Sequence, residues 1–182
     1  MHPKEFKKVK NGTGHLTHLS LKNSELFVGI DFTNHERINE IIQTHESYIL
    51  YPSKDSLNLS DTKLHTSVKK SRAIFLIDST WACSIKMLRE SKNLHSLPYV
   101  SFNSTKVSEF TIKEQPQEYC LSTIESTLSV LELLNKWNIE NLKKSDIEGF
   151  LTPFYKMIEY QLECIKNPKS RAVRFKRKSA ER

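Results

Sequence analysis

The stretch FLIDSTWACSIKML, residues 75–88, places an aspartate, two hydroxyls and an indole at the joint between two predicted elements. Its first half is an apolar run typical of a buried strand, and its second half has helical spacing. Asp78 can orient or accept a proton and Trp81 can stack on a planar ring, while the hydroxyls between them can donate hydrogen bonds. Alternatively, Asp78 or Ser79 only caps the helix that begins near Thr80. Trp81 would then only pack that helix on the sheet.

Two further polar loops lie beside predicted elements. The segment 51–53, Tyr-Pro-Ser, follows the apolar run SYIL, and the segment 121–125, Leu-Ser-Thr-Ile-Glu, follows the polar stretch KEQPQEYC. Each has a purely structural explanation, because Tyr-Pro-Ser can end a strand and Ser122-x-x-Glu125 fits a helix capping box. The signatures GxGxxG, GxxxxGK[ST], GxSxG and HExxH are absent from the sequence. Rossmann dinucleotide binding and P-loop phosphate transfer are therefore disfavoured.

The elements around these loops determine where the loops meet. Apolar periodicity predicts strands over 15–21, 25–30, 47–51, 73–78, 97–102 and 109–112, and helices over 35–45, 80–91, 121–137 and 145–165. The polar stretch 53–71 is expected to be a loop with at most a short helix. Strands that alternate with helices predict an α/β fold with a mainly parallel sheet. Ligands of such sheets bind beyond the carboxyl ends of the strands, which is where the joint at Asp78 lies.

Length and composition are those of one folded domain. The chain has 182 residues, 37% of them hydrophobic and 9% aromatic, which is enough for a packed core. No apolar run approaches the roughly 20 residues of a bilayer span, so we expect a soluble, cytoplasmic, monomeric protein that does not contact membranes. Cys83, Cys120 and Cys164 lack CxxC spacing, and His15 and His18 would point to opposite faces of a strand. No metal site is therefore expected.

The net charge of +7 is concentrated at the end of the chain. Residues 166–182 carry eight basic residues against Glu181 alone, a surplus that equals the whole net charge. Such a tail attracts phosphate backbones through counterion release without reading base sequence. Alternatively, it is a solvated terminus that keeps the protein soluble. We therefore divide the chain into a domain at 1–165 and a basic tail at 166–182.

Five segments, in order, resemble the DTW-domain family, which takes its name from an Asp-x-Thr-Trp motif. The family's signature strand and helix correspond to LIDSTWACSIKML (76–88). The other four are HPKEFKKVKNGTGHLTHLSLKNSEL (2–26), ILYPS (49–53), LPYVSF (97–102) and IKEQPQEYCLSTIES (112–126). Three features depart from the family pattern. The sequence has no counterpart of the cysteine cluster of many bacterial members, Lys113 stands where arginine is usual, and the Asn-Thr-Gly turn reads Asn-Gly-Thr-Gly.

The resemblance implies a SPOUT-like α/β domain with a C-terminal trefoil knot that holds S-adenosylmethionine. It also implies an enzyme that moves the 3-amino-3-carboxypropyl group of this donor to N3 of a uridine in tRNA and releases methylthioadenosine. The expected partner is therefore tRNA. Two alternatives stay open: a SPOUT-type RNA methyltransferase that uses the same donor, and a non-catalytic RNA-binding module.

The resemblance also implies roles for individual residues. The expected catalytic residues are Asp78, Thr80 and Trp81, with Trp81 either stacking on a flipped-out uracil or lining the donor pocket. The expected donor-binding residues are Tyr51, Pro52, Ser53, Leu97, Pro98, Val100, Leu121, Ser122, Thr123 and Glu125. Of these, Leu97, Pro98 and Val100 are expected to line the adenine through backbone contacts. Glu125 is expected to accept a hydrogen bond from the amino group of the transferred chain. The expected RNA contacts are Lys113, Arg171, Arg174, Lys176, Arg177 and Lys178.

Acidity limits what Asp78 can do in this reaction. Uridine N3–H is about as acidic as a phenol, so an ordinary carboxylate is about five pKa units too acidic to remove its proton easily, a deficit of about 7 kcal/mol. Proton transfer concerted with attack in a water-poor site lowers that cost. Orientation of the uracil is therefore the favoured role for Asp78, with a general base or an electrostatic partner of the sulfonium as the alternatives.

Overall fold

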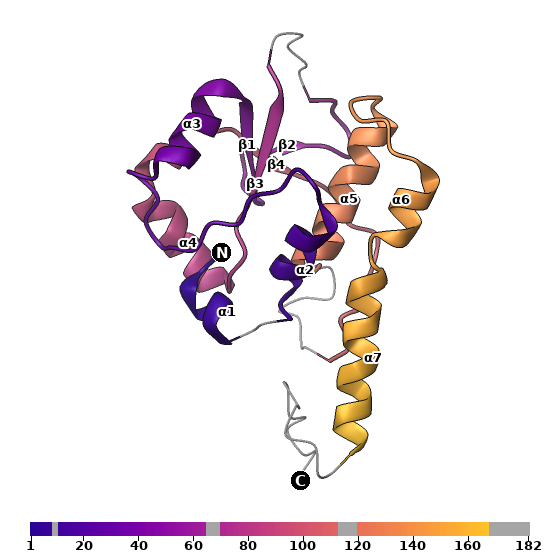
Figure 1. Ribbon diagram of the computed structural model, residues 1–182. Coiled ribbons are helices and arrows are strands. Elements are labelled where there is room, and N and C mark those ends of the chain that lie inside the picture. The colour runs from indigo at the N-terminus through magenta and orange to yellow at the C-terminus, as the bar shows by residue number, and fades with distance from the viewer. Residues whose placement is uncertain (9–10, 65–69, 113–119, 168–182) are drawn as a thin grey trace.

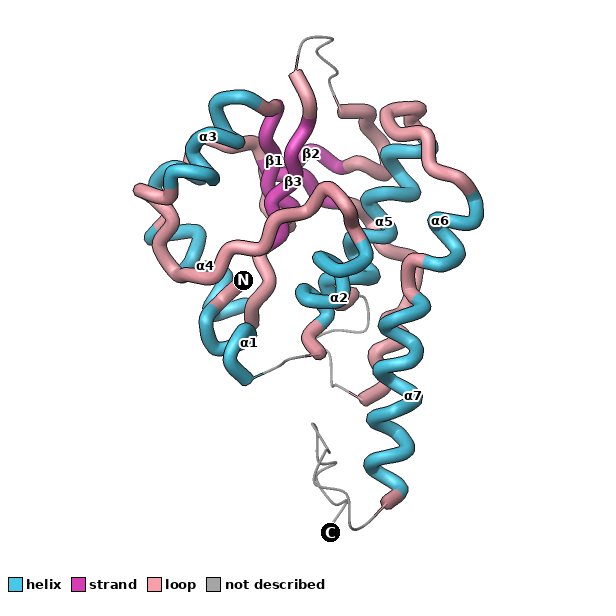
Figure 2. The backbone as a smooth tube through the Cα atoms, in the orientation of Figure 1, coloured by secondary structure: helices cyan, strands magenta, loops and turns pink. Residues whose placement is uncertain are grey.

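A four-stranded parallel sheet forms the centre of the protein (Figures 1 and 2). The computed structural model describes residues 1–8, 11–64, 70–112 and 120–167. The strands are β1 (Glu46–Leu50), β2 (Leu57–Asn58), β3 (Arg72–Leu76) and β4 (Tyr99–Ser101), in the order β2-β4-β1-β3. Each of the three strand pairs is parallel. The predicted α/β class with a mainly parallel sheet is therefore confirmed, while the SPOUT relationship and the trefoil knot stay predictions.

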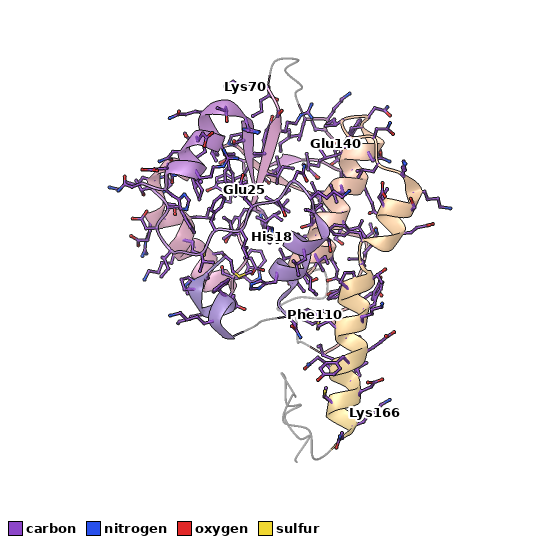
Figure 3. All side chains as sticks on the ribbon, viewed as in Figure 1. His18, Glu25, Lys70, Phe110, Glu140 and Lys166 are labelled. Carbon is purple, nitrogen blue, oxygen red and sulfur yellow. The ribbon has the colours of Figure 1, made fainter. Side chains whose placement is uncertain are left out.

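Helices lie on both sides of this sheet. They are α1 (Pro3–Lys8), α2 (Thr13–Ser20), α3 (Glu36–Thr44), α4 (Trp81–Glu90), α5 (Thr123–Lys136), α6 (Lys144–Gly149) and α7 (Thr152–Lys166), with a short 3-10 helix, η1, at Lys92–Leu94. α3 and α4 lie on one side of the sheet, and α2, α5, α6 and α7 lie on the other (Figure 1). α7 extends away from the sheet and carries Lys166 at its far end (Figure 3). No helix in the described part of the chain is long and apolar enough to cross a membrane.

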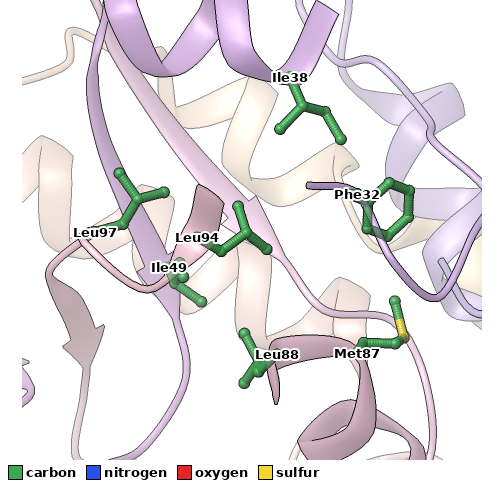
Figure 4. Packing of buried hydrophobic residues seen from close by; sticks show 7 residues of the cluster. All are labelled: Phe32, Ile38, Ile49, Met87, Leu88, Leu94 and Leu97. Atoms are coloured by element: carbon green, nitrogen blue, oxygen red, sulfur yellow. The ribbon is translucent and has the colours of Figure 1, made fainter. Parts of the chain in front are cut away.

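Alternation along the strands divides the core into two layers. Ile49 of β1 packs with Ile38 of α3 and Met87 of α4 on one face of the sheet (Figure 4). The next residue, Leu50, packs on the opposite face with the cluster that contains Val130 of α5. Successive residues of a strand point to opposite faces, so β1 contributes to both layers. A third cluster joins α5 to α6 and α7 on the outer side.

The segment 15–21, predicted as a strand, lies largely in helix α2, and that prediction was wrong. The buried residues of α2 are Gly14 and Thr17, whereas Leu19 is 80% exposed. Small side chains on the buried side suit close packing of α2 on its neighbours. The hydrophobic pattern therefore does not mark the buried face of this helix, which is why periodicity misassigned it.

Two other predicted strands, 25–30 and 109–112, are irregular segments. Phe27 and Ile30 nonetheless pack against the core on the α3–α4 side, so the first of them is apolar for packing and not for sheet pairing. Conversely, the predicted loop 53–71 contributes the short strand β2.

The last predicted helix, 145–165, is divided into α6 and α7. Pro153 lies in the first turn of α7, where its missing N–H removes no helical hydrogen bond. The sequence Ser145-x-x-Glu148 also predicts a capping box, and that prediction was wrong, because α6 already begins at Lys144. The carboxylate of Asp146 accepts instead from the Lys143 N–H at 3.3 Å.

Candidate active site

A cavity of about 740 Å³ lies where β1, β3 and β4 end and where α2, α4 and α5 begin. Small-molecule sites commonly have volumes of roughly 300–1,000 Å³, so the cavity has a suitable size. The predicted site residues that line it are Tyr51, Pro52, Asp78, Thr80, Trp81, Leu121, Ser122 and Thr123. Three polar loops that are far apart in the sequence therefore meet at one edge of the parallel sheet.

Five residues predicted to bind the donor lie outside this lining. Val100 is fully buried in the core layer under α5, because its place on β4 directs it there, and Leu97 is buried in the opposite layer. Pro98 and Ser53 are exposed. Glu125 is buried at the start of α5 and lines a separate, smaller cavity. The side chains of Ser53 and Glu125 therefore do not line this cavity, while backbone contacts of Leu97, Pro98 and Val100 with the donor stay a prediction.

The basic residues predicted to contact RNA lie outside the described residues. They are Lys113 in the segment 113–119, and Arg171, Arg174, Lys176, Arg177 and Lys178 in the segment 168–182. Their role stays a prediction.

A third strand end, whose contribution was not predicted from the sequence, also lines the cavity. The residues that follow or end β4 and line the cavity are Ser101, Phe102, Asn103 and Ser104. The rule that directed attention to the ends of β1 and β3 also applies to β4, so this loop could have been found from the sequence. Two further hydroxyl residues of the lining, Thr13 of α2 and Ser84 of α4, were not predicted either.

Asp78 is held from three directions. Thr123 donates through Oγ1 to Asp78 Oδ1 at 2.7 Å, and the His2 N–H donates to the Asp78 carbonyl at 3.0 Å. The carboxylate also lies so close to Gly14 that a methyl group on that residue would overlap it. The carboxylate thus lies between the first turns of α2 and α5, where helix dipoles favour a negative charge. Burial lowers the pKa of the Met1 amine, which also lines the cavity, and the charge of Asp78 opposes that shift.

Trp81 forms part of the cavity wall and is not a core anchor. Its side chain is 45% exposed, and its ring meets Tyr51 edge-on with centroids 5.6 Å apart. The Tyr51 hydroxyl lies 3.3 Å from Ser84 Oγ, which in turn donates to the Trp81 carbonyl at 2.7 Å. Thr80 is the N-cap of α4 and makes no side-chain bond to the first turn. The first turn of α4 therefore faces the cavity, and the Thr80 side chain does not cap it. A helix N-terminus of this kind favours anions.

Glu125 binds neighbouring segments of the chain. Its carboxylate accepts from the Ser122 N–H and hydroxyl at 2.8 and 2.5 Å, which confirms the predicted capping box. It also accepts from the Ser108 hydroxyl at 2.8 Å and the Glu109 N–H at 2.7 Å. These four donors fasten the segment around residue 108 to the start of α5. The geometry therefore favours a structural role for Glu125 over contact with the transferred amino group.

His, Cys, Asp and Glu are the side chains that most often bind metal ions. Within residues 1–8, 11–64, 70–112 and 120–167, no three His, Cys, Asp or Glu side chains are grouped so as to hold a metal ion.

Comparison with known families decides the classification, because the model of the DTW domain matches residues 1–162. The chain belongs to the DTW domain family. The Asp-x-Thr-Trp motif of the DTW domain is Asp78-Ser79-Thr80-Trp81 here, and all four residues line the cavity.

Curated proteins similar to this DTW chain carry one name, tRNA-uridine aminocarboxypropyltransferase 2. The protein of Drosophila melanogaster is 29% identical over 130 residues, which are 71% of this chain and 48% of that protein. The protein of Mus musculus is 33% identical over 116 residues, which are 63% of this chain and 36% of that protein. The chain thus spans less than half the length of either relative. No solved structure gives a significant match.

Proposed function

We propose that this DTW domain transfers the 3-amino-3-carboxypropyl group of S-adenosylmethionine to N3 of a uridine in tRNA. N3 attacks the methylene carbon next to sulfur, so that an N–C bond forms while the S–C bond breaks. The electron pair of that bond stays on sulfur, the product is methylthioadenosine, and the N3 proton leaves to solvent. The observation that carries the proposal is the meeting of the Asp-x-Thr-Trp residues with the other polar loops in one cavity. The names of the relatives supply the reaction class.

The cavity residues fit the donor's chemical groups. A sulfonium is a soft cation, and the faces of Trp81 and Tyr51 with the charge of Asp78 supply suitable partners. The carboxylate of the transferred group suits the uncapped first turn of α4. The hydroxyls of Ser101 and Ser104 at the end of β4 suit the polar edges of a nucleoside. When bound, the donor supplies an electrophilic carbon, and these residues supply orientation and charge.

The contacts that hold Asp78 support a role in orienting the uracil rather than in removing its N3 proton. Thr123 donates to the carboxylate, which lies between the first turns of α2 and α5. Such surroundings hold an acceptor for the uracil N3–H in a fixed position. We therefore assign Asp78 to binding and orienting the target uracil beside the electrophilic carbon.

Product analysis tests the proposal directly. The protein, S-adenosylmethionine and tRNA are incubated together, and the small-molecule product and the modified nucleoside are identified by mass spectrometry. We expect methylthioadenosine and a uridine that carries the aminocarboxypropyl group. S-adenosylhomocysteine would indicate a methyltransferase instead. If calorimetry detects tRNA binding but no S-adenosylmethionine binding, the protein is an RNA-binding module and the proposal is wrong.

Replacing Trp81 with alanine tests its assignment to the cavity wall. Because the indole is half exposed, Trp81→Ala is expected to leave the melting temperature nearly unchanged while raising the KM for tRNA or donor about tenfold, since stacking on an aromatic ring contributes about 1–3 kcal/mol. Trp81→Phe should recover most of the loss. The control is Ile85→Ala, one turn along α4 at an exposed residue outside the lining, which should alter KM less than twofold. Equal effects of Trp81→Ala and Ile85→Ala would contradict the assignment.

A further inference from the structure

The Asp78 carboxylate lies between the N-termini of two helices, α2 and α5. Its carboxylate touches Gly14, the second residue of α2, and Thr123, the first residue of α5. A Cβ built on Gly14 would come closer to three atoms of the Asp78 side chain than real Cβ atoms approach any neighbour. The missing side chain of Gly14 is therefore what leaves room for the carboxylate at the start of α2.

Backbone freedom does not explain this glycine. No glycine in the described part of the chain has a positive φ, and Gly14 lies inside a helix. Alanine is the better helix former at an ordinary helical residue. Gly149 provides the contrast, because it is also helical and a Cβ on it would meet nothing within 4 Å. The space next to Asp78 distinguishes the two glycines.

We propose that Gly14 and Thr123 are positioning residues that hold the Asp78 carboxylate in one place between the N-termini of α2 and α5. Gly14 provides the space, and the Thr123 hydroxyl provides a directed hydrogen bond. The His2 N–H fixes the Asp78 backbone from the third side. What the held carboxylate then does to uridine depends on the proposed function, whereas the positioning itself can be tested without it.

Thermal unfolding of four chains tests the space at Gly14: wild type, Gly14→Ala, Asp78→Ala and the double variant. Gly14→Ala is expected to lower the melting temperature by roughly 3–8 °C when Asp78 is present and to leave it unchanged or raise it when residue 78 is alanine. Gly149→Ala should leave the melting temperature unchanged or raise it by up to about 3 °C, by the same amount in either background. An equal loss from Gly14→Ala in both backgrounds would overturn the proposal.

Steady-state kinetics test the hydrogen bond from Thr123. Thr123→Val keeps the shape of the side chain and removes the donor, whereas Thr123→Ser keeps the donor. We expect Thr123→Val to lower kcat at least tenfold with the KM for tRNA changed less than threefold, and Thr123→Ser to restore kcat to within about threefold of wild type. Equal kcat values for the two variants would overturn the positioning role of Thr123. If the wild type forms no methylthioadenosine, the proposed function fails, and the unfolding comparison still reports on Gly14.

Discussion

Replacing Asp78 with alanine is expected to reduce kcat/KM for aminocarboxypropyl transfer at least about 100-fold, because misplacing a reacting group by about 1 Å already costs about 100-fold. The residue lies in the cavity with its carboxylate fixed by Thr123, so the alanine variant removes a carboxylate that is held in one position. Asp78→Asn keeps the shape and loses the charge. We expect Asp78→Asn to lose nearly as much activity, because both the N3–H acceptor and the attraction to the sulfonium weaken.

The measurement is the initial rate of methylthioadenosine formation with tRNA as acceptor, together with circular dichroism to confirm folding. Asp55→Ala is the matched control, because Asp55 is an exposed aspartate on the loop after β1 and lies outside the cavity lining. It should keep at least half of wild-type activity. If Asp78→Ala stays within fivefold of wild type while Asp55→Ala behaves as expected, Asp78 has no part in the reaction.

Much of the secondary structure around Asp78 could be predicted from the sequence, because it is formed by clearly apolar runs of residues. The strands that contain Ile49 and Phe75 are short and apolar, and both form the predicted parallel pair. The capping box of Ser122 and Glu125 is a local feature, and local hydrogen bonds leave a clear sequence pattern. Parallel strands then bring their carboxyl ends to one edge, which is why three distant loops could be expected to meet.

What could not be predicted depends on contacts between distant segments. Helix α2 buries Gly14 and Thr17 and exposes Leu19, and no hydrophobicity pattern identifies such a face. The side chain of Val100 points from β4 into the core, and the sequence does not show which of the two faces of the sheet it meets. The sequence likewise shows an acid at Glu125 but not the Ser108 and Glu109 donors that reach it from another loop.

Glu125 leads to the largest expected effect on stability. The side chain is 7% exposed, and its carboxylate accepts four hydrogen bonds, two from Ser122 and one each from Ser108 and Glu109. Removing it by Glu125→Ala leaves buried donors without an acceptor at the start of α5. We expect a loss of about 3–4 kcal/mol in the free energy of unfolding, since each buried donor left unpaired costs about 1–3 kcal/mol and such costs are not fully additive.

Urea unfolding measures this loss, and two variants make the result specific. Glu125→Gln keeps the size of the side chain and one acceptor oxygen, but its N–H₂ group replaces the other oxygen and cannot accept from the surrounding donors. We therefore expect it to lose about half as much stability as Glu125→Ala. Glu132→Ala, two turns further along α5, removes a surface carboxylate that pairs with Lys106 at 2.7 Å and should cost less than about 1 kcal/mol. Because Ser122 and Thr123 lie in the cavity wall, destabilising the start of α5 should also lower transfer activity in Glu125→Ala. A stability loss no larger than that of Glu132→Ala would mean that the four bonds do not hold the 108–110 segment to α5, and Glu125 would again be a candidate for direct contact with the donor.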